Sequence, residues 1–382
     1  MWEVAAAFAR LGITSFGGPI AHLGYFRDEF VTRRKWLSDA QLAEMIALAQ
    51  ATPGPASSKV GMQIGFERAG LAGAAIAWFC FTLPSALVMT AFAFGVGHVD
   101  PHAGWIAGLL LAAAAVVASA LLGMARTLTP DAPRLGFALL VAAALIVVPA
   151  NGFTQLGAIV LGGLLGKWLA PSQPDVAVEH PADRAVPAWS IVALAAFFVL
   201  LALSFVSSPL SAFGEFSRFY AAGALVFGGG HVVLPLLQGR FVTPGFISPT
   251  TFLAGYAVAQ VIPGPLFTFA SFLGVVVPPV RGVAGAALAL AGIFLPSVLL
   301  LVATVPVWRR LRANVVFRRA LTGINAAVVG ILGAAFYQPI LTSAVHNGID
   351  VAIALAGFAA LYALRLPPLP IVAGCALLRA FL

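Results

Sequence analysis

Two proline–glycine–proline segments interrupt apolar stretches of the sequence, and polar side chains lie beside both. The segments are Pro53-Gly54-Pro55 and Pro263-Gly264-Pro265. Their polar neighbours are Gln50, Ser57, Ser58 and Lys59 for the first segment, and Gln260 and Thr268 for the second. A helix that restarts after such a break presents free N–H groups and the positive end of its dipole, which together bind anions. The pattern predicts an anion site, although a simple kink or surface turn would explain one segment taken alone.

Two glycine-rich breaks lie upstream of these segments. They are Gly17-Gly18, just after Ser15, and Gly228-Gly229-Gly230. Glycine allows positive φ angles, so successive N–H groups can form a nest around an oxyanion. His22 follows the first break and His231 ends the second. An imidazole there can hydrogen-bond an oxyanion or carry a coupling proton; a histidine bound to a backbone carbonyl explains each position equally well.

Ionisable residues inside apolar stretches are costly and therefore count as functional candidates. Arg10 is expected to clamp a tetrahedral dianion through its fork of donors. Glu44 joins the two histidines as a candidate for proton coupling, and it could instead neutralise an arginine. Arg218 lies near the end of an apolar stretch, where snorkelling toward the membrane interface is the favoured interpretation.

The composition indicates an all-α polytopic membrane protein. Of 382 residues, 61% are hydrophobic and only 9% are charged, whereas soluble domains carry about 25% charged residues. The net charge of +8 lies in short gaps between apolar runs, where it orients helices in the bilayer and does not indicate nucleic acid. The sequence has no hydrolase, metalloprotease, nucleotide-binding or dinucleotide-binding motif. We expect no enzyme activity, no cofactor and no metal site.

Apolar runs long enough to cross a bilayer, about 20 residues, predict the spanning helices. The runs are Leu71–Gly97, Gly104–Ala125, Leu135–Ala150, Phe153–Ala170, Ala188–Ser207, Val283–Val307, Ala320–Ile340, Val351–Leu364 and Pro367–Leu382. The most hydrophilic stretch, Pro171–Pro187, is typical of a surface linker.

The interrupting motifs recur in the same order with a nearly constant offset in the numbering. The offset is 211 for the glycine-rich breaks and 210 for the proline–glycine–proline segments. Leu83-Pro84-Ser85 recurs as Leu295-Pro296-Ser297 at an offset of 212. The chain is therefore interpreted as two copies of one unit, each somewhat shorter than half of the sequence.

Charge in equivalent loops indicates that the two copies face opposite ways. Arg27–Lys35 holds four basic residues and its counterpart Gln238–Ile247 holds one, whereas Trp308–Arg319 holds five arginines and its counterpart none. Lys- and Arg-rich loops lie in the cytoplasm. We therefore expect two inverted-topology repeats, residues 1–170 and 212–382, joined by residues 171–211 as a hydrophilic linker plus a connecting transmembrane helix.

Both proline–glycine–proline segments are expected to turn broken or re-entrant helical hairpins. Arg27–Lys35 and Glu67-Arg68 both look cytoplasmic, so the segment between them, Gln41–Gly65, would enter and return on one side. Full crossings are the alternative. A hairpin of this kind needs protein or a water-filled cavity around its freed backbone groups.

The motifs resemble the chromate ion transporter family over nearly the whole chain, in its long two-domain form. They are Phe8-x-Arg10-Leu11-Gly12-x-x-Ser15-Phe16-Gly17-Gly18-Pro19, Gln50-x-x-Pro53-Gly54-Pro55 and Leu83-Pro84-Ser85, with Phe227-Gly228-Gly229-Gly230-His231 and Gln260-x-x-Pro263-Gly264-Pro265 in the second half. The resemblance implies a multi-pass carrier of the cell inner membrane that exports chromate, confers chromate resistance and uses the proton-motive force. There are two departures from the family pattern: Gly230 stands in place of a proline like Pro19, and no basic residue lies beside Thr268. If one repeat dominates binding, these differences favour the first half.

The sequence thus predicts a secondary transporter that binds chromate, or the analogous sulfate, between the repeats at broken-helix N-termini. Its partners are the oxyanion and the lipid bilayer, and a homodimer is left open. The alternatives are a sulfate or other oxyanion transporter, a passive anion channel of the same fold, and a membrane-embedded enzyme, which the missing motifs disfavour.

Overall fold

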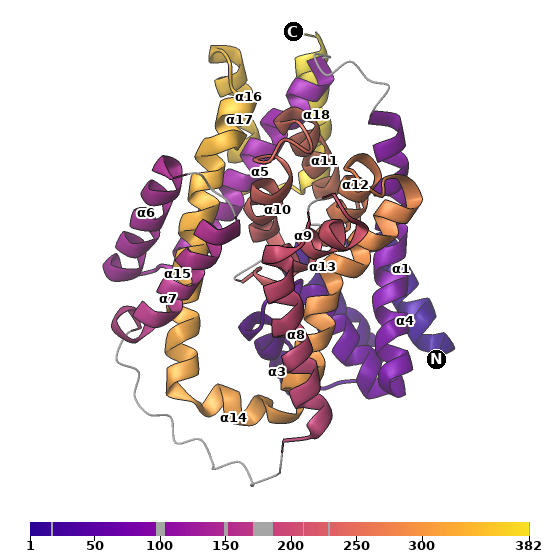
Figure 1. Ribbon diagram of the computed structural model, residues 1–382. Helices are drawn as coiled ribbons and strands as arrows, with labels where there is room; N and C mark the ends of the chain where they lie inside the picture. The colour runs from indigo at the N-terminus through magenta and orange to yellow at the C-terminus, as the bar shows by residue number, and fades with distance from the viewer. Residues whose placement is uncertain are drawn as a thin grey trace.

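The structure is a computed structural model that describes residues 1–16, 18–96, 104–148, 152–170, 186–208, 210–227 and 230–381 (Figure 1). Every element in these ranges is a helix, which confirms the prediction of an all-α protein. The proposed linker falls almost entirely outside the described residues, and the boundaries of the two repeats stay predictions.

The first half begins with several short helices and continues with longer ones. Its elements are α1 (Trp2–Thr14), α2 (Gly18–Phe26), the π-helix η1 (Arg27–Arg33), α3 (Asp39–Ala51), α4 (Ala56–Val96), α5 (Gly104–Leu128), α6 (Ala132–Val147) and α7 (Gly152–Leu169). The long helix α4 is kinked, because Ala69 and Gly70 have non-helical backbone angles. It is therefore two helices in series.

The connecting helix α8 (Ala188–Val206) leads into a second half with a similar order of elements. The elements are α9 (Ala212–Ala224), η2 (Gly230–Val232), α10 (Val233–Phe241), α11 (Pro249–Val261), η3 (Leu266–Thr268), α12 (Phe269–Val276), α13 (Gly282–Thr304), η4 (Val305–Val307), α14 (Trp308–Ala313), α15 (Val315–Ala335), η5 (Phe336–Leu341), α16 (Thr342–Ala344), α17 (Gly348–Tyr362) and α18 (Pro368–Phe381).

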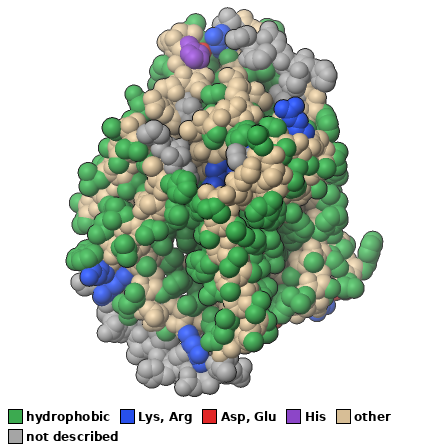
Figure 2. Space-filling view, viewed as in Figure 1, with side chains coloured by type: hydrophobic (Ala, Val, Ile, Leu, Met, Phe, Trp, Pro, Cys, Tyr) green, Lys and Arg blue, Asp and Glu red, His purple; other side chains and the backbone are tan. Residues whose placement is uncertain are grey.

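Five helical stretches in the described residues are long and apolar enough to cross a membrane. They are Ala56–Gly95, Gly104–Leu128, Ala188–Val206, Gly282–Val307 and Val315–Ala344. Each of the nine predicted apolar runs coincides with a helix or with part of one. Apolar side chains cover much of the visible face in Figure 2, as expected of a surface in contact with lipid.

The first proline–glycine–proline segment joins the two arms of a hairpin. The side chain of Gln63 on α4 donates to the carbonyl of Met45 on α3 (3.2 Å), so the arms lie side by side. At the open end, Trp36 lies under the guanidinium groups of both Arg34 and Arg68, at 5.2 and 5.1 Å. The chain therefore enters and leaves this hairpin at one end of the molecule.

The second hairpin consists of α11 and α12 and is closed in a comparable way. Phe252 on α11 contacts Phe269 on α12, with ring centroids 5.1 Å apart. At the open end, Arg218 lies over Phe246 (4.1 Å) and donates to the carbonyl of Pro278 (3.2 Å). In Figure 1, α3 lies in the lower part of the view and α11 in the upper part. The opposite membrane orientation of the two halves stays a prediction.

Helices of the two halves also contact each other closely through small residues. A Cβ at Gly108 on α5 would overlap the backbone of Cys375 on α18, and a Cβ at Gly162 on α7 would overlap the backbone of Gly323 on α15. Small residues let helix backbones approach within a bilayer, where van der Waals contact favours association. These contacts hold helices of one half against helices of the other half.

Candidate functional site

The site is centred on the two hairpin tips, Thr52–Pro55 and Ile262–Pro265. Each tip turns at a glycine with a positive φ angle, 107° at Gly54 and 98° at Gly264, a conformation that L side chains rarely adopt. A serine N-cap begins the first arm of each hairpin: Ser38 for α3 and Ser248 for α11. Proline and glycine then end these arms, and a new helix starts at Ala56 or Leu266.

The first tip is held by residues of the second half. The Gly54 amide donates to the carbonyl of Val226 (2.7 Å). A Cβ at Gly54 would overlap Oγ of Ser297 on α13. Val226 lies just before the glycine-rich break of its half, and Ser297 belongs to the recurring Leu-Pro-Ser motif.

The second tip is held by the equivalent residues of the first half. The Gly264 amide donates to the carbonyl of Ser15 (2.9 Å), and a Cβ at Gly264 would come 2.6 Å from Oγ of Ser85. Ser15 and Ser85 are the counterparts of Val226 and Ser297 in the repeat, at offsets of 211 and 212. The two tips thus make reciprocal contacts, each with the glycine-rich break and the Leu-Pro-Ser motif of the other half.

Several buried polar groups around these contacts have no hydrogen-bond partner within the described part of the chain. They are the hydroxyls of Ser15, Ser58, Thr82 and Ser297 and the Nδ1 atom of His22. Nε2 of His22 lies 3.1 Å from the Ser15 carbonyl, so this ring contacts the same residue as the second tip. Buried polar groups are normally paired. The concentration of unpaired ones here fits a ligand or ordered water between the halves.

Lys59 is fully buried and makes three hydrogen bonds to the first tip. Its ammonium group donates to the carbonyl of Thr52 (2.5 Å), to the hydroxyl of Thr52 (2.8 Å) and to the carbonyl of Pro53 (3.1 Å). An ammonium group has three protons, so these bonds use all of them. Lys59 therefore positions the tip, and it has no free donor for direct contact with an anion.

The corresponding polar residues of the second tip contact their own half. The Thr268 hydroxyl donates to the carbonyl of Pro265 (2.8 Å). His231 lies beside two side chains, with its Nδ1 atom 2.9 Å from the Tyr256 hydroxyl and 3.3 Å from Nε2 of Gln260. The structure thus brings His231 and Gln260 together.

The two remaining polar neighbours of the first tip differ in burial. Ser57 is buried beside the tip, whereas Gln50 is exposed. Gln260 contacts another candidate residue of the site, His231, and the roles of Gln50 and Gln260 in binding stay predictions.

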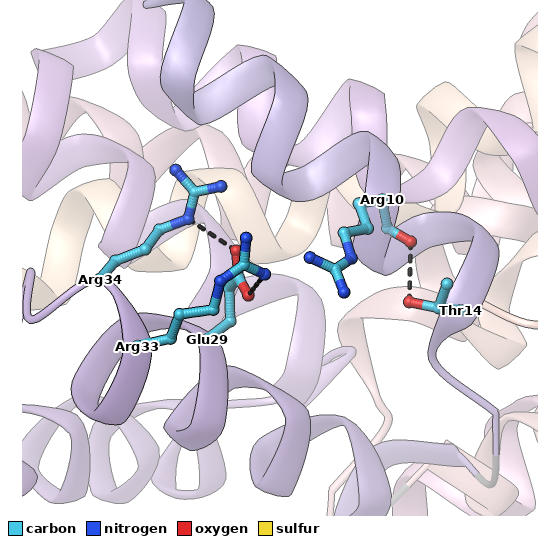
Figure 3. A network of polar contacts seen from close by, with 5 residues as sticks. All are labelled: Arg10, Thr14, Glu29, Arg33 and Arg34. Atoms are coloured by element: carbon cyan, nitrogen blue, oxygen red, sulfur yellow. Dashed lines mark hydrogen bonds and ion pairs between the residues drawn. The ribbon is translucent and has the colours of Figure 1, made fainter.

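Arg10 does not join the surroundings of the tips. Its side chain is exposed, and Figure 3 shows it pointing toward Glu29, which is ion-paired with Arg33 (2.9 Å) and Arg34 (2.6 Å). Glu44 is half-buried on α3. Of the glycine nests, Gly17, Gly228 and Gly229 lie outside the described residues, while Gly18 begins α2 and Gly230 is buried in η2.

Three residues of the site were not predicted from the sequence. Ser85 and Ser297 contact the tip glycines, and Tyr256 lies beside His231. The two serines were visible as part of a recurring motif, but a repeated Leu-Pro-Ser inside an apolar run indicates a helix kink before it indicates a contact. Tyr256 has no motif around it. A cavity of about 160 Å³ lies elsewhere, lined in part by Gln155, Gln238 and Gln338.

Comparison with known proteins matches the chain to the chromate transporter family over residues 2–167 and 213–380. The chain is 28% identical to the chromate transport protein of Cupriavidus metallidurans over an alignment of 385 positions that covers 98% of this chain and 92% of the relative. It is also 28% identical to a probable chromate transport protein of Synechococcus elongatus over 347 residues, 87% of this chain and 83% of the relative. Uncharacterized transporter YwrB of Bacillus subtilis is 34% identical over 116 residues, 30% of this chain and 58% of the relative.

No solved structure matches the chain at a significant level. The family match covers both halves, and the relatives are named as transport proteins, not enzymes. Together with the five apolar helices of membrane length among the described residues, this makes the chain a multi-pass membrane transporter. It belongs to the chromate transporter family.

Proposed function

We propose that this chain exports chromate across the cell inner membrane, driven by the proton-motive force. The oxyanion would bind between the two halves, next to the hairpin tips. The relatives named as chromate transport proteins support the substrate. The observation that carries the binding site is the reciprocal tip contact, because it gathers unpaired buried hydroxyls from both halves at two equivalent places.

The chemistry of this region suits an oxyanion with four acceptor oxygens. The hydroxyls of Ser58 and Ser297 are available as donors. Nδ1 of His22 is a third donor in the tautomer that carries its proton on that atom. The helix that restarts at Ala56 directs the positive end of its dipole toward the tip. Sulfate has nearly the same charge and geometry, so we expect it to compete.

Alternation between two open states follows from the way the tips are held. Among the described residues, each tip glycine joins the other half through one backbone hydrogen bond, and such a bond contributes only about 1 kcal/mol net. Separation of one tip contact at a time would expose the anion to one side and then the other, which fits inverted-repeat carriers. His22, His231 and Glu44 are the candidates for the coupled proton. His22 is favoured because its ring contacts the Ser15 carbonyl, which also accepts the hydrogen bond from the Gly264 amide.

The test is chromate flux into proteoliposomes under an imposed pH gradient, with excess sulfate as competitor. We expect saturable accumulation that collapses with a protonophore and is inhibited by sulfate. Flux without accumulation against a gradient would identify a passive channel. Accumulation of sulfate with no transport of chromate would reassign the substrate. Empty liposomes and a Gly54→Ala variant serve as controls.

A further inference from the structure

Two buried arginines of the second half carry N–H groups that are unpaired within the described chain. Arg218 on α9 and Arg240 on α10 are each only 7% exposed. Arg218 donates through Nη2 to the Pro278 carbonyl, but its Nε and Nη1 have no partner, and neither do Nε and Nη2 of Arg240. Guanidinium groups stay charged in proteins and need acceptors when buried. These unpaired charged donors therefore call for a ligand.

Aromatic rings contact both guanidinium groups but accept none of their in-plane N–H hydrogen bonds. Arg218 lies over Phe246 at 4.1 Å and over Phe241 at 5.3 Å, and Arg240 lies over Phe205 at 5.1 Å. Cation–π contact stabilises a cation by its position over the ring face, but the ring offers no acceptor in the plane of the N–H groups. Phe241 adjoins Arg240 in sequence, and the two arginine charges are close enough to repel each other.

The one acidic side chain of this cluster, Glu215, interacts electrostatically with Arg218 but can balance only one of the two arginine charges. Glu215 lies one helical turn before Arg218 and is fully buried. Its Oε2 accepts a hydrogen bond from the Val280 amide (2.9 Å), and its Oε1 has no partner among the described residues. Two arginines and one carboxylate leave an excess of positive charge in a buried place. An anion from outside the chain would balance that charge.

In the first half, the buried charge at the position equivalent to Arg240 is neutralised by ion pairs within the chain. At the repeat offset of 211, Glu29 is the counterpart of Arg240, and Ala7 is the counterpart of Arg218. Glu29 is also buried, yet it accepts from Arg33 and Arg34 in two ion pairs. The unneutralised charge is thus particular to the second half, so the repeated architecture does not require it.

We infer that Arg218 and Arg240 form a second binding site, separate from the hairpin tips, for a tetrahedral oxyanion. Guanidinium forks bind sulfate-, chromate- or phosphate-like oxygens in pairs. The site lies at the open end of the second hairpin, because Arg218 contacts residues on both sides of that hairpin, Phe246 and Pro278.

The oxyanion can come from solution or from the headgroup phosphate of a lipid, and the experiment separates the two. Radiolabelled sulfate is titrated by equilibrium dialysis onto the delipidated full-length protein in detergent. We expect two sulfates per wild-type chain and one per chain in Arg240→Gln. Arg319→Gln, which removes an exposed arginine of α15, is the matched control and should bind two. Equal binding by Arg240→Gln and Arg319→Gln would overturn the inference.

A Ser58→Ala/Ser297→Ala variant separates this site from the proposed tip site. If the tip proposal is right, that variant also binds one sulfate, and its combination with Arg240→Gln binds none. If the tip proposal fails, the serine variant binds as the wild type does while Arg240→Gln still loses one sulfate. Arg240→Lys, which keeps the charge but loses the fork, should weaken the second site about tenfold.

The lipid source is tested on the protein before delipidation. If a phospholipid occupies the site, the wild type purifies with a bound phospholipid that Arg240→Gln lacks, and sulfate binds there only after the lipid is removed. If the wild type and Arg240→Gln carry the same lipid and the same number of sulfates, no oxyanion site exists. Melting temperature without sulfate checks folding: Arg240→Gln should match or exceed the wild type, because it removes an unpaired buried charge.

Discussion

Gly54 and Gly264 occupy positions that tolerate no side chain, for two separate reasons. Their φ angles of 107° and 98° are strained for any other residue. Their Cα hydrogens face the serines of the opposite half, where a Cβ would meet Ser297 or Ser85. The proline–glycine–proline segments are thus shaped by a neighbour in the other half of the sequence as well as by their own turn.

We expect Gly54→Ala to lower stability by about 1–3 kcal/mol from backbone strain alone and to abolish chromate flux. Gly24→Ala is the control, because nothing lies within 4 Å of a Cβ at that position. Melting temperature and flux are measured for both. Adding Ser297→Ala to Gly54→Ala should recover part of the stability, since it removes the overlapping hydroxyl. Wild-type flux in Gly54→Ala would contradict the close tip contact.

Lys59→Met tests whether Lys59 positions the tip. The change leaves the carbonyls of Thr52 and Pro53 without their donor, and each unpaired buried group costs about 1–3 kcal/mol. We expect a lower melting temperature together with lost transport. Lys167→Met, at an exposed lysine of α7, should leave both unchanged. A variant that loses sulfate affinity at an unchanged melting temperature would show that Lys59 acts on the anion alone.

At the scale of the elements, the breaks were predictable and their partners were not. Proline, glycine and the Ser38 and Ser248 caps act within a few residues, so local pattern was enough to locate both hairpins. The contacts of Gly54 with Val226 and of Gly264 with Ser15 join segments far apart in sequence. Nothing in hydrophobic periodicity states which backbone carbonyl will receive such an amide.

The spacing of apolar residues in the first helix already predicts that Arg10 is exposed. The buried positions of α1 include Val4, Ala7, Phe8 and Leu11, which follow the spacing of one helical face. Arg10 falls off that stripe and is exposed. Whether an arginine inside an apolar stretch is buried therefore depends on which face of the helix it lies on, and not only on the apolar residues next to it in the sequence.

The inverted arrangement predicts that equivalent loops open to opposite sides of the membrane. Thr32 and Thr243 are exposed residues related by the repeat offset of 211, next to the open ends of the two hairpins. In a background with Cys80 and Cys375 replaced by alanine, Thr32→Cys should react with an impermeant maleimide only from the cytoplasmic side, and Thr243→Cys only from the outside. Labelling of both from one side would show parallel halves.

At the scale of the whole molecule, the halves contact each other at the hairpin tips and along two pairs of helices. The tips exchange contacts, and α5 and α7 lie against α18 and α15 through glycine. None of these contacts depends on a covalent link between the halves.

We therefore expect a chain divided within residues 171–185 to work when both fragments are made together. Residues 1–178 and 179–382, co-expressed, should co-purify and support chromate flux at a level near that of the intact protein. Either fragment alone should show none, because its tip would lack the opposite carbonyl and serine. Flux by one fragment alone would place the whole pathway inside a single half.

The reciprocal tips also bear on how the protein is made. At a synthesis rate of about 5–20 residues per second, the stretch from Gly54 to Val226 takes roughly 10–30 s to emerge. Throughout that interval the first hairpin has been synthesised while the acceptor for its Gly54 amide does not yet exist. Ser15, conversely, is made long before the Gly264 amide that donates to it. The protein must therefore pass through a half-finished stage in which neither tip contact can form.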